Sequence, residues 1–185
     1  MRVIAGKFKG SKLISPRGEV RPTTDMVKGS LFSVLEAKSL VKGATCLDVF
    51  CGSGALGIEA LSRGAHSCVF VDENIFNALS NLDKLRINAR TIKSDFRRAL
   101  RMLRGEKFDL IFCDPPYKSG FAELAVKAVV KYGMLAENGV MVVEYGSENE
   151  LIKVPGTCII DNRTFGASAF EILRGDNECD NSRDV

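Results

Sequence analysis

From residue 45 onward, short apolar runs alternate with helix-length amphipathic stretches, and this rhythm limits the fold more than any other feature of the chain. Apolar runs bounded by turn residues are typical of buried strands, and their alternation with helices is typical of a parallel sheet covered on both faces. The pattern predicts an α/β fold with strands near 45–50, 67–72, 90–93, 108–113, 139–145, 157–160 and 168–173. It predicts helices near 55–64, 74–86, 95–104 and 120–132.

The rhythm changes at both ends of the chain. Only a short predicted turn region, Asp161–Arg163, separates the last two strands, which favours an antiparallel pair at one sheet edge. Near the start, residues 2–5 and 12–15 are expected to form a small hairpin. Residues 24–38 carry apolar side chains at helical spacing, which predicts a helix packed on the core through Met26, Val27, Leu31, Phe32 and Leu35.

The length of 185 residues and the hydrophobic content of 45% suit one well-buried domain. We expect a basic N-terminal hairpin appendage at 1–22, a main domain at 23–174 and a disordered tail at 175–185, which has almost nothing to bury. No apolar run approaches the roughly 18 to 20 residues of a membrane span, and the first residues lack the apolar core of a signal peptide. A cytoplasmic location is therefore expected.

Charge is distributed unevenly along the chain. The formal net charge is +3, yet residues 1–30 alone carry a net +5, so the remainder is slightly acidic. A basic arm on a near-neutral body suits contact with phosphates, although such a run is as often a solvated surface. A second basic group, between Lys84 and Lys107, resembles an exposed helix face.

Cysteine and histidine usage argues against a metal site. The six cysteines include no Cys-x-x-Cys pair, and His66 is the single histidine. Most of the cysteines lie in or beside apolar runs, so we expect buried, reduced thiols, with Cys179 exposed in the tail.

A glycine-rich loop follows the first predicted strand. Its small residues let a ligand approach the backbone before a helix begins. The spacing of Gly52, Gly54 and Gly57 fits the G-x-G-x-x-G fingerprint of dinucleotide-binding enzymes. The candidate cofactor-binding residues here are Asp48, Phe50, Gly52, Ser53 and Gly54.

Two acidic residues decide between the possible cofactors of this loop. Asp72 ends the next strand, where it would hold ribose hydroxyls for either a nicotinamide or flavin dinucleotide or S-adenosylmethionine. Asp48 precedes the loop, where its charge would face a pyrophosphate but would attract the ammonium group of S-adenosylmethionine. The sequence therefore favours S-adenosylmethionine over a dinucleotide.

Asp95 and Phe96 follow the third predicted strand. Asp95 is placed to accept a hydrogen bond from an adenine amino group, with Phe96 packed beside the ring. Asp95 also fits the N-cap position of the next helix, and the two roles are compatible.

The buried strand near 108–113 ends in Asp114-Pro115-Pro116-Tyr117. Prolines cannot donate ladder hydrogen bonds, so the chain must leave the sheet and turn at this point. The turn offers a carboxylate, the Pro115 carbonyl and an aromatic ring, which suit a flat base with an exocyclic amino group. The candidate catalytic residues are Asp114, Pro115 and Tyr117; a plain sheet-ending turn is the alternative.

With these motifs in place, the chain resembles class I S-adenosylmethionine-dependent methyltransferases and, more narrowly, the RsmD family of bacterial ribosomal RNA guanine-N2 methyltransferases. The resemblance spans nearly all of residues 1–174. It is carried by Met1-Arg-Val-Ile-Ala-Gly6, by Arg21-Pro-Thr-Thr-Asp25 and by the stretch Gly52–Ala65. It implies a Rossmann-like, seven-stranded, mostly parallel sheet in the order 3-2-1-4-5-7-6, with the active site above the carboxyl ends of the strands.

The resemblance also implies an activity and its partners. S-adenosylmethionine would be the cofactor, and the exocyclic N2 of one guanosine in 16S ribosomal RNA would accept the methyl group within a partly assembled small-subunit particle. The candidate substrate-binding residues are Arg21, Thr23 and Tyr117, although Arg21-Pro-Thr equally suits a capped helix entrance. A monomer is the simplest expectation.

Two sites depart from the family pattern, and neither touches the predicted chemistry. Near the end of the chain, Phe165-Gly166 replaces the usual Tyr-Gly. Where the family usually carries an Arg-Glu pair, this chain has Lys28-Gly29, so any ion pair or RNA contact of that glutamate is missing.

Two other functions remain open on sequence grounds. The same Asp-Pro-Pro-Tyr motif serves adenine-N6 methylation of DNA or RNA, although no room remains here for a separate DNA-recognition domain. The chain could also be a non-catalytic RNA-binding assembly factor, against which the intact acids at 48, 72 and 114 argue.

Overall fold

A computed structural model describes residues 1–15, 25–116, 120–147, 154–166 and 168–176. The strands are β1 (Thr45–Val49), β2 (Ser67–Asp72), β3 (Arg90–Lys93), β4 (Phe108–Cys113), β5 (Leu135–Gly146), β6 (Thr157–Phe165) and β7 (Ser168–Gly175). The helices are α1 (Asp25–Ala37), α2 (Ala55–Ser62), α3 (Phe76–Lys84), α4 (Phe96–Met102) and α5 (Phe121–Lys131). The predicted α/β rhythm is confirmed.

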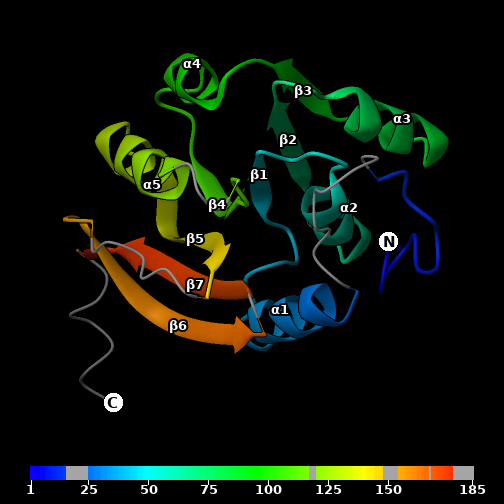
Figure 1. The fold of residues 1–185 in the computed structure, drawn as a ribbon, viewed down its shortest axis with the longest axis horizontal. Helices are drawn as coiled ribbons and strands as arrows, with labels where there is room; N and C mark the ends of the chain where they lie inside the picture. The colour runs from blue at the N-terminus through cyan, green and yellow to red at the C-terminus, as the bar shows by residue number, and fades with distance from the viewer. Residues whose placement is uncertain (16–24, 117–119, 148–153, 167, 177–185) are drawn as a thin grey trace.

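The seven strands form one sheet in the order β3-β2-β1-β4-β5-β7-β6 (Figure 1). Strands β1 to β5 run parallel, and β7 pairs antiparallel with both β5 and β6. This is the order implied by the resemblance, including the antiparallel pair at one edge. The direction of winding reverses between the neighbours β1 and β4, and in open α/β sheets ligands bind at such a reversal, beyond the carboxyl ends of the strands.

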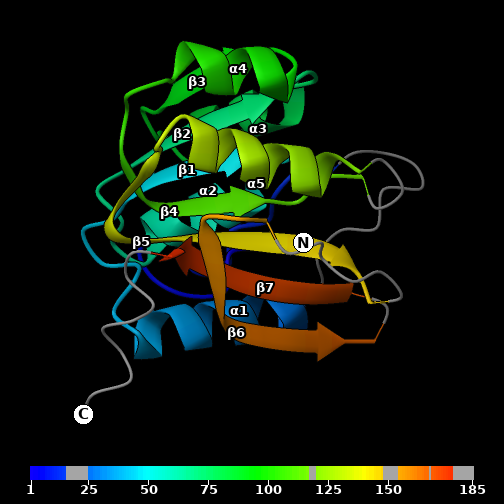
Figure 2. The same ribbon diagram turned by 90° about the vertical axis from the view of Figure 1, so that its left-hand side faces the viewer.

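Two helix layers cover opposite faces of the sheet (Figures 1 and 2). Residues of α1, α2 and α3 pack with one set of inward strand residues, such as Cys46 and Phe112. Residues of α4 and α5 pack with the alternate set, such as Leu47 and Ile111. Successive strand residues face opposite sides of the sheet, and helices cover both sides. The central strands therefore have continuous apolar sequences.

The predicted turn at Asp161–Arg163 is wrong, because these three residues lie inside β6. β6 is an edge strand, and its ladder shifts register between Ile159 and Asp161. An edge strand has solvent beside it and tolerates a polar stretch and a bulge, so polarity there does not mark a turn.

The helix predicted near 24–38 is confirmed as α1, but Met26 does not belong to its packed stripe. Val27, Leu31, Phe32 and Leu35 are buried, whereas Met26 is 75% exposed.

The first 15 residues form an irregular hairpin rather than two regular strands. Arg2 and Lys12 form an isolated antiparallel bridge, flanked by the hydrogen bond from Val3 N to Ser11 O (3.0 Å). Val3 and Leu13 are nevertheless buried in the same core cluster as α1 and α2. We refer to residues 1–15 as the N-terminal segment.

At the other end, β7 includes Gly175, and Asp176 N donates to Gly156 O, so the sheet reaches slightly beyond the expected boundary at 174. The rest of the tail, 177–185, lies outside the described residues. Within the described part of the chain, no helix is long and apolar enough to span a bilayer.

Candidate active site at the carboxyl edge of the sheet

The predicted site residues gather at one edge because four parallel strands end there in register. Val49 of β1 pairs with Val71 of β2 on one side and with Cys113 of β4 on the other. Asp72 pairs with Lys93 of β3. The segments after β1, β2, β3 and β4 therefore meet above the same edge, and the Asp114 segment lies beside the glycine-rich loop, as Asp114 N approaches Val49 O at 3.5 Å.

The glycine-rich loop adopts a backbone that its small residues permit. Gly52 and Gly54 have φ of 53° and 76°, and Phe50 has φ of 62°. Gly54 is the N-cap of α2, and a Cβ on Gly57 would lie 2.5 Å from the Phe70 ring. The loop thus turns sharply while α2 packs closely on β2, which are the two roles expected of a ligand-binding glycine loop.

Asp48 lies beneath this loop and is 1% exposed. Its Oδ2 accepts a hydrogen bond from Gly57 N at 2.9 Å, so the carboxylate caps the first turn of α2 from the neighbouring strand. Burial raises the pKa of Asp48 to about 7; the Gly57 N–H opposes this shift and the charge of Asp72 adds to it. Asp48 is therefore a buried acid that titrates near neutral pH.

Asp72 connects β2 to the same loop. Its Oδ2 accepts from Gly52 N and its Oδ1 from Asn74 N, both at 2.8 Å. A carboxylate has about four acceptor positions, so both oxygens retain capacity for ligand hydroxyls.

Asp95 is the N-cap of α4, as its position in the sequence allowed. Its carboxylate accepts from Arg97 N (2.9 Å) and Arg98 N (3.4 Å), and Arg97 Nη1 lies 3.1 Å from its Oδ2. The predicted contact of Asp95 with adenine stays a prediction.

Three phenylalanines from three different segments meet at this edge. Phe50 and Phe96 lie with ring centroids 4.8 Å apart, and Phe121, the first residue of α5, lies 5.2 Å from Phe96 and 6.2 Å from Phe50. The Arg97 guanidinium sits over Phe96 and Phe121 at 4.8 and 5.0 Å from their centroids. We call these four residues the aromatic cluster.

Phe121 and Arg97 of the aromatic cluster were absent from the sequence-predicted set. Phe121 lies seven positions after Asp114 and belongs to no recognisable motif, so only the packing of α5 near α4 places it at the site. The aromatic cluster offers flat apolar surface and a cation, a combination that suits an aromatic ligand ring.

Asp114 and Pro115 follow β4 directly. Asp114 is partly exposed at the carboxyl edge, whereas Pro115 is buried. The Asp114 charge raises the pKa of Cys113, behind the larger effect of burial, so this carboxylate lies near the end of the strand. Tyr117, Arg21 and Thr23 lie outside the described residues, and their predicted roles stay predictions.

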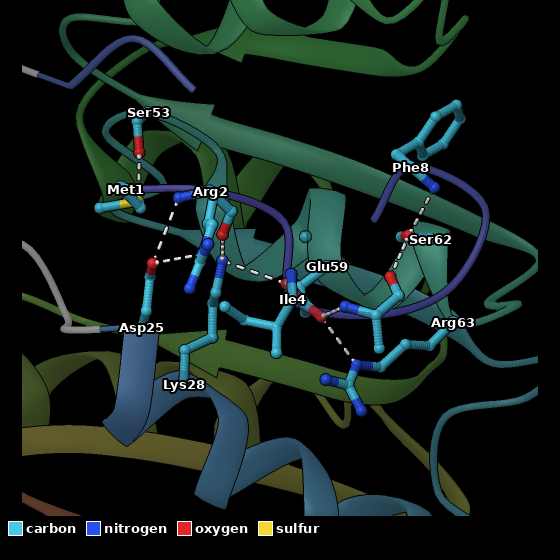
Figure 3. A network of polar contacts seen from close by, with 12 residues as sticks. Met1, Arg2, Ile4, Phe8, Asp25, Lys28, Ser53, Glu59, Ser62 and Arg63 are labelled. Atoms are coloured by element: carbon cyan, nitrogen blue, oxygen red, sulfur yellow. Dashed lines mark hydrogen bonds and ion pairs between the residues drawn. The ribbon is translucent and has the colours of Figure 1, made fainter. Parts of the chain in front are cut away.

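The N-terminal segment is bound to α2 by a buried ionic network (Figure 3). Glu59 of α2 accepts hydrogen bonds from Ile4 N (2.8 Å) and Ala5 N (3.0 Å) and pairs with Lys28 (3.1 Å) and Arg63 (2.8 Å). The side chains of Lys28 and Glu59 are both 0% exposed, and Lys28 Nζ also donates to Arg2 O. The departure at Lys28 from the family pattern thus concerns an internal ion pair.

The expectation of buried, reduced thiols is confirmed for four cysteines. Cys46, Cys51, Cys68 and Cys113 are buried and free, and burial raises the pKa of Cys46 to about 12 and raises that of the other three as well. The expectation fails for Cys158, which is disulfide-bonded. Within the described residues, no group of three or more His, Cys, Asp or Glu side chains is placed to hold a metal ion.

With this geometry established, similarity to known proteins is informative. The family described as Conserved hypothetical protein 95 matches residues 1–174. Ribosomal RNA small subunit methyltransferase D of Escherichia coli K12 is 38% identical over 160 residues, which cover 84% of this chain and 79% of that protein. The chain belongs to the RsmD family.

Two further similar proteins extend the similarity over almost the whole chain. The Bacillus subtilis protein YlbH is 39% identical over 184 residues, 94% of this chain and 98% of its own length. The structure of the Escherichia coli protein yhhF superposes with a TM-score of 0.84 at 34% identity, covering 95% of this chain and 97% of that one. The fold is that of class I methyltransferases.

Proposed function

We propose that the protein transfers a methyl group from S-adenosylmethionine to the exocyclic N2 of a guanosine in 16S ribosomal RNA. The observation that carries the proposal is the pairing of β1 with β4, which sets the glycine-rich loop and the Asp114-Pro115 segment side by side. RsmD relatives named as ribosomal RNA small subunit methyltransferases support the class of substrate.

The cofactor would lie across the loops that follow β1, β2 and β3. Asp48 would attract its ammonium group, Gly52, Ser53 and Gly54 would admit it to the backbone, and Asp72 would hold the ribose hydroxyls. Asp95 and Phe96 would meet the adenine. When bound, S-adenosylmethionine supplies an electrophilic methyl group on a sulfonium.

The chain's own residues would act on the target base. The guanine N2 would form a bond to the methyl carbon while the carbon–sulfur bond breaks, and the electron pair of that bond would stay on the sulfur of S-adenosylhomocysteine. Asp114 would accept one N2 proton and the Pro115 carbonyl would orient the other, while Tyr117 would stack on the base. Most of the rate would come from orientation, because the proton becomes acidic only as the new bond forms.

The RNA would be contacted through the basic segment that contains Arg21 and Thr23, within a small-subunit particle assembled in the cytoplasm. A monomer suffices for this scheme, since one chain supplies all the proposed contacts.

The test is methyl transfer from labelled S-adenosylmethionine to small-subunit particles that lack the modification, followed by nucleoside analysis. Labelled N2-methylguanosine is expected. Labelled N6-methyladenosine would establish the adenine rival, which shares the Asp-Pro-Pro-Tyr motif. Cofactor binding without label would point to a missing partner or a different substrate, and absence of cofactor binding would favour the non-catalytic role.

The Asp114→Ala variant tests the chemical step. We expect turnover to fall at least about 100-fold, the scale of a positioned proton acceptor, while affinity for S-adenosylhomocysteine stays within about threefold. The control is Asp109→Asn at the start of the same strand, where the carboxylate accepts only from Thr45 N among the contacts described. Unchanged turnover in Asp114→Ala would refute the assignment.

A further inference from the structure

Asn81 of α3 forms hydrogen bonds to two separate parts of the chain, although its side chain belongs to no predicted motif. It is 0% exposed. Its Oδ1 accepts from Ile14 N at 2.8 Å, and its Nδ2 donates to Ile14 O and to Ser53 O, both at 2.9 Å. One buried carboxamide thus bonds both backbone groups of a residue in the N-terminal segment and the backbone of the glycine-rich loop.

Each polar group of this carboxamide is engaged. The amide has two N–H donors, and they meet two carbonyls; its oxygen meets an N–H. In a fully buried position, loss of any one partner leaves an unpaired polar group, which is costly. Displacing Ile14 therefore disturbs the same side chain that holds Ser53.

Ser53 is the residue between the two left-handed glycines of the loop. Gly52 and Gly54 have φ of 53° and 76°, so holding the Ser53 carbonyl restrains the turn on both sides of it. A second contact reaches Ser53 from the N-terminal segment, as its Oγ donates to Met1 Sδ at 3.7 Å (Figure 3). The loop conformation is therefore supported directly by Met1 of the docked segment and indirectly by Asn81, which also binds Ile14 of that segment.

We infer that Asn81 is a positioning residue that couples the cofactor loop to the N-terminal segment, so that cofactor binding and docking of residues 1–15 favour each other. The inference rests on the proposed cofactor site. It deepens the function, because the stretch with Arg21 and Thr23 begins just after Ile14 in the sequence and ends at Asp25, which pairs with Arg2. Cofactor occupancy would then favour the docked positions of Ile14 and Asp25, which flank the stretch that contains Arg21 and Thr23.

The first measurement uses the unaltered protein. Hydrogen exchange of residues 1–15 is followed with and without saturating S-adenosylhomocysteine. Coupling predicts that the ligand slows exchange of the Ile14 amide about fivefold or more, because the docked segment opens less often. Equal exchange rates with ligand bound would overturn the inference.

Gly6→Ala separates coupling from simple support of the loop. A Cβ at Gly6 would lie 1.8 Å from Ser62 O at a φ of +79°, so the substitution should push the segment off α2 without touching residues 53 or 81. Because coupling is reciprocal, affinity for S-adenosylhomocysteine should fall about fivefold or more. A freed segment with unchanged affinity would show that Asn81 supports the loop only locally.

Asn81→Asp completes the design. It keeps the shape and the acceptor but sets a carboxylate oxygen against two carbonyls, so affinity should fall about tenfold or more. Added to Gly6→Ala, it should lower affinity by less than it does alone, since both act through one contact. Additive losses would contradict the coupling.

Asn88→Asp, at an exposed position after α3, controls for the added charge. All these readouts measure ligand binding and exchange, so a failure of guanine methylation would leave them interpretable.

Discussion

At the scale of single residues, Asp48 has the most consequential environment. Its pKa is raised from 3.8 to about 7, mainly by burial, so near neutral pH the carboxyl is poised between its two forms. A cation placed nearby favours the ionised form. If the cofactor ammonium lies near Asp48, binding must release a proton from this group.

Affinity for S-adenosylhomocysteine should therefore rise as pH increases from 5.5 to about 7 and then level off. The ligand favours the carboxylate, and the free protein holds that carboxylate only above the raised pKa. Isothermal titration at several pH values measures the trend.

Asp48→Asn is the matched variant, since it keeps the size and an acceptor for Gly57 N. Its affinity should be weaker and flat across this pH range. The wild type should also lose stability as pH rises from about 4 to about 7 and then level off, because between these values only the folded state keeps the proton, whereas the variant should not. A pH-dependent affinity in Asp48→Asn would exclude Asp48 as the titrating group.

At the scale of elements, α2 links the glycine-rich loop to the N-terminal segment. The loop leads into its first turn, Glu59 lies in its middle, and Ser62 at its end accepts from Phe8 N. Glu59 is buried with four hydrogen-bonded or ionic partners. A carboxylate in this buried position is stable only because its partners together offset the free-energy cost of removing its charge from water.

Glu59→Ala should destabilise the protein by about 3 to 5 kcal/mol, because it leaves Lys28 buried without its carboxylate. Glu36→Ala is the matched control: Glu36 also pairs with Arg63, but its side chain is 48% exposed, so the loss should stay within about 1 kcal/mol. Urea unfolding of both variants measures the difference. Equal losses would show that the buried network is not a special source of stability.

Two glycines test how closely the helices pack. A Cβ at Gly57 would meet Phe70 at 2.5 Å and Cys68 Sγ at 2.7 Å, whereas one at Gly29 in α1 would meet only Ile4 Cγ2, at 3.9 Å. Gly57→Ala should therefore cost about 1 to 3 kcal/mol through overpacking. Gly29→Ala should stabilise α1 by about 0.5 to 1 kcal/mol through helix propensity. Thermal unfolding gives both signs, and a tolerated Gly57→Ala would mean that α2 can move away from β2.

At the scale of the whole molecule, the sheet order decides which loops share an edge. β1 and β4 are separated by some 60 residues in the chain but pair directly, with Val49 opposite Cys113. This pairing unites a loop suited to a cofactor with a turn suited to a base. Helices on both faces bury the strands, so the variable chemistry is confined to the carboxyl edge.

Much of this architecture was predictable from local patterns. β2, β3 and β4 have the bounds that their apolar runs predict. β5 begins earlier than predicted, at Leu135, because pairing with Phe108 extends it through polar residues. β6 was cut short at a polar stretch that an edge strand accepts. Boundaries failed where a neighbouring strand, rather than the residue's own preference, decides the pairing.

The residues of the candidate site also fall into a group that local patterns predicted and a group that they did not. The acids at 48, 72, 95 and 114 were found because each lies at or near the carboxyl end of a predicted strand, and such positions gather at one edge of a parallel sheet. Asn81, Phe121 and the Lys28–Glu59 pair were not, because an asparagine or a charge on a helix has no local sign of burial. Their roles depend on partners 28 or more residues away, or on a helix approaching from another segment.

The sequence by itself determined the order of strands and helices, the carboxyl-edge acids and the family, because these depend on spacing within short segments. Only the tertiary structure decided which polar side chains lie in the interior and what they join. Burial and hydrogen-bond partners depend on segments that are distant in the chain and meet only in the fold. Glu59 and Asn81 therefore gain their partners in the N-terminal segment only when that segment docks on α2 and α3.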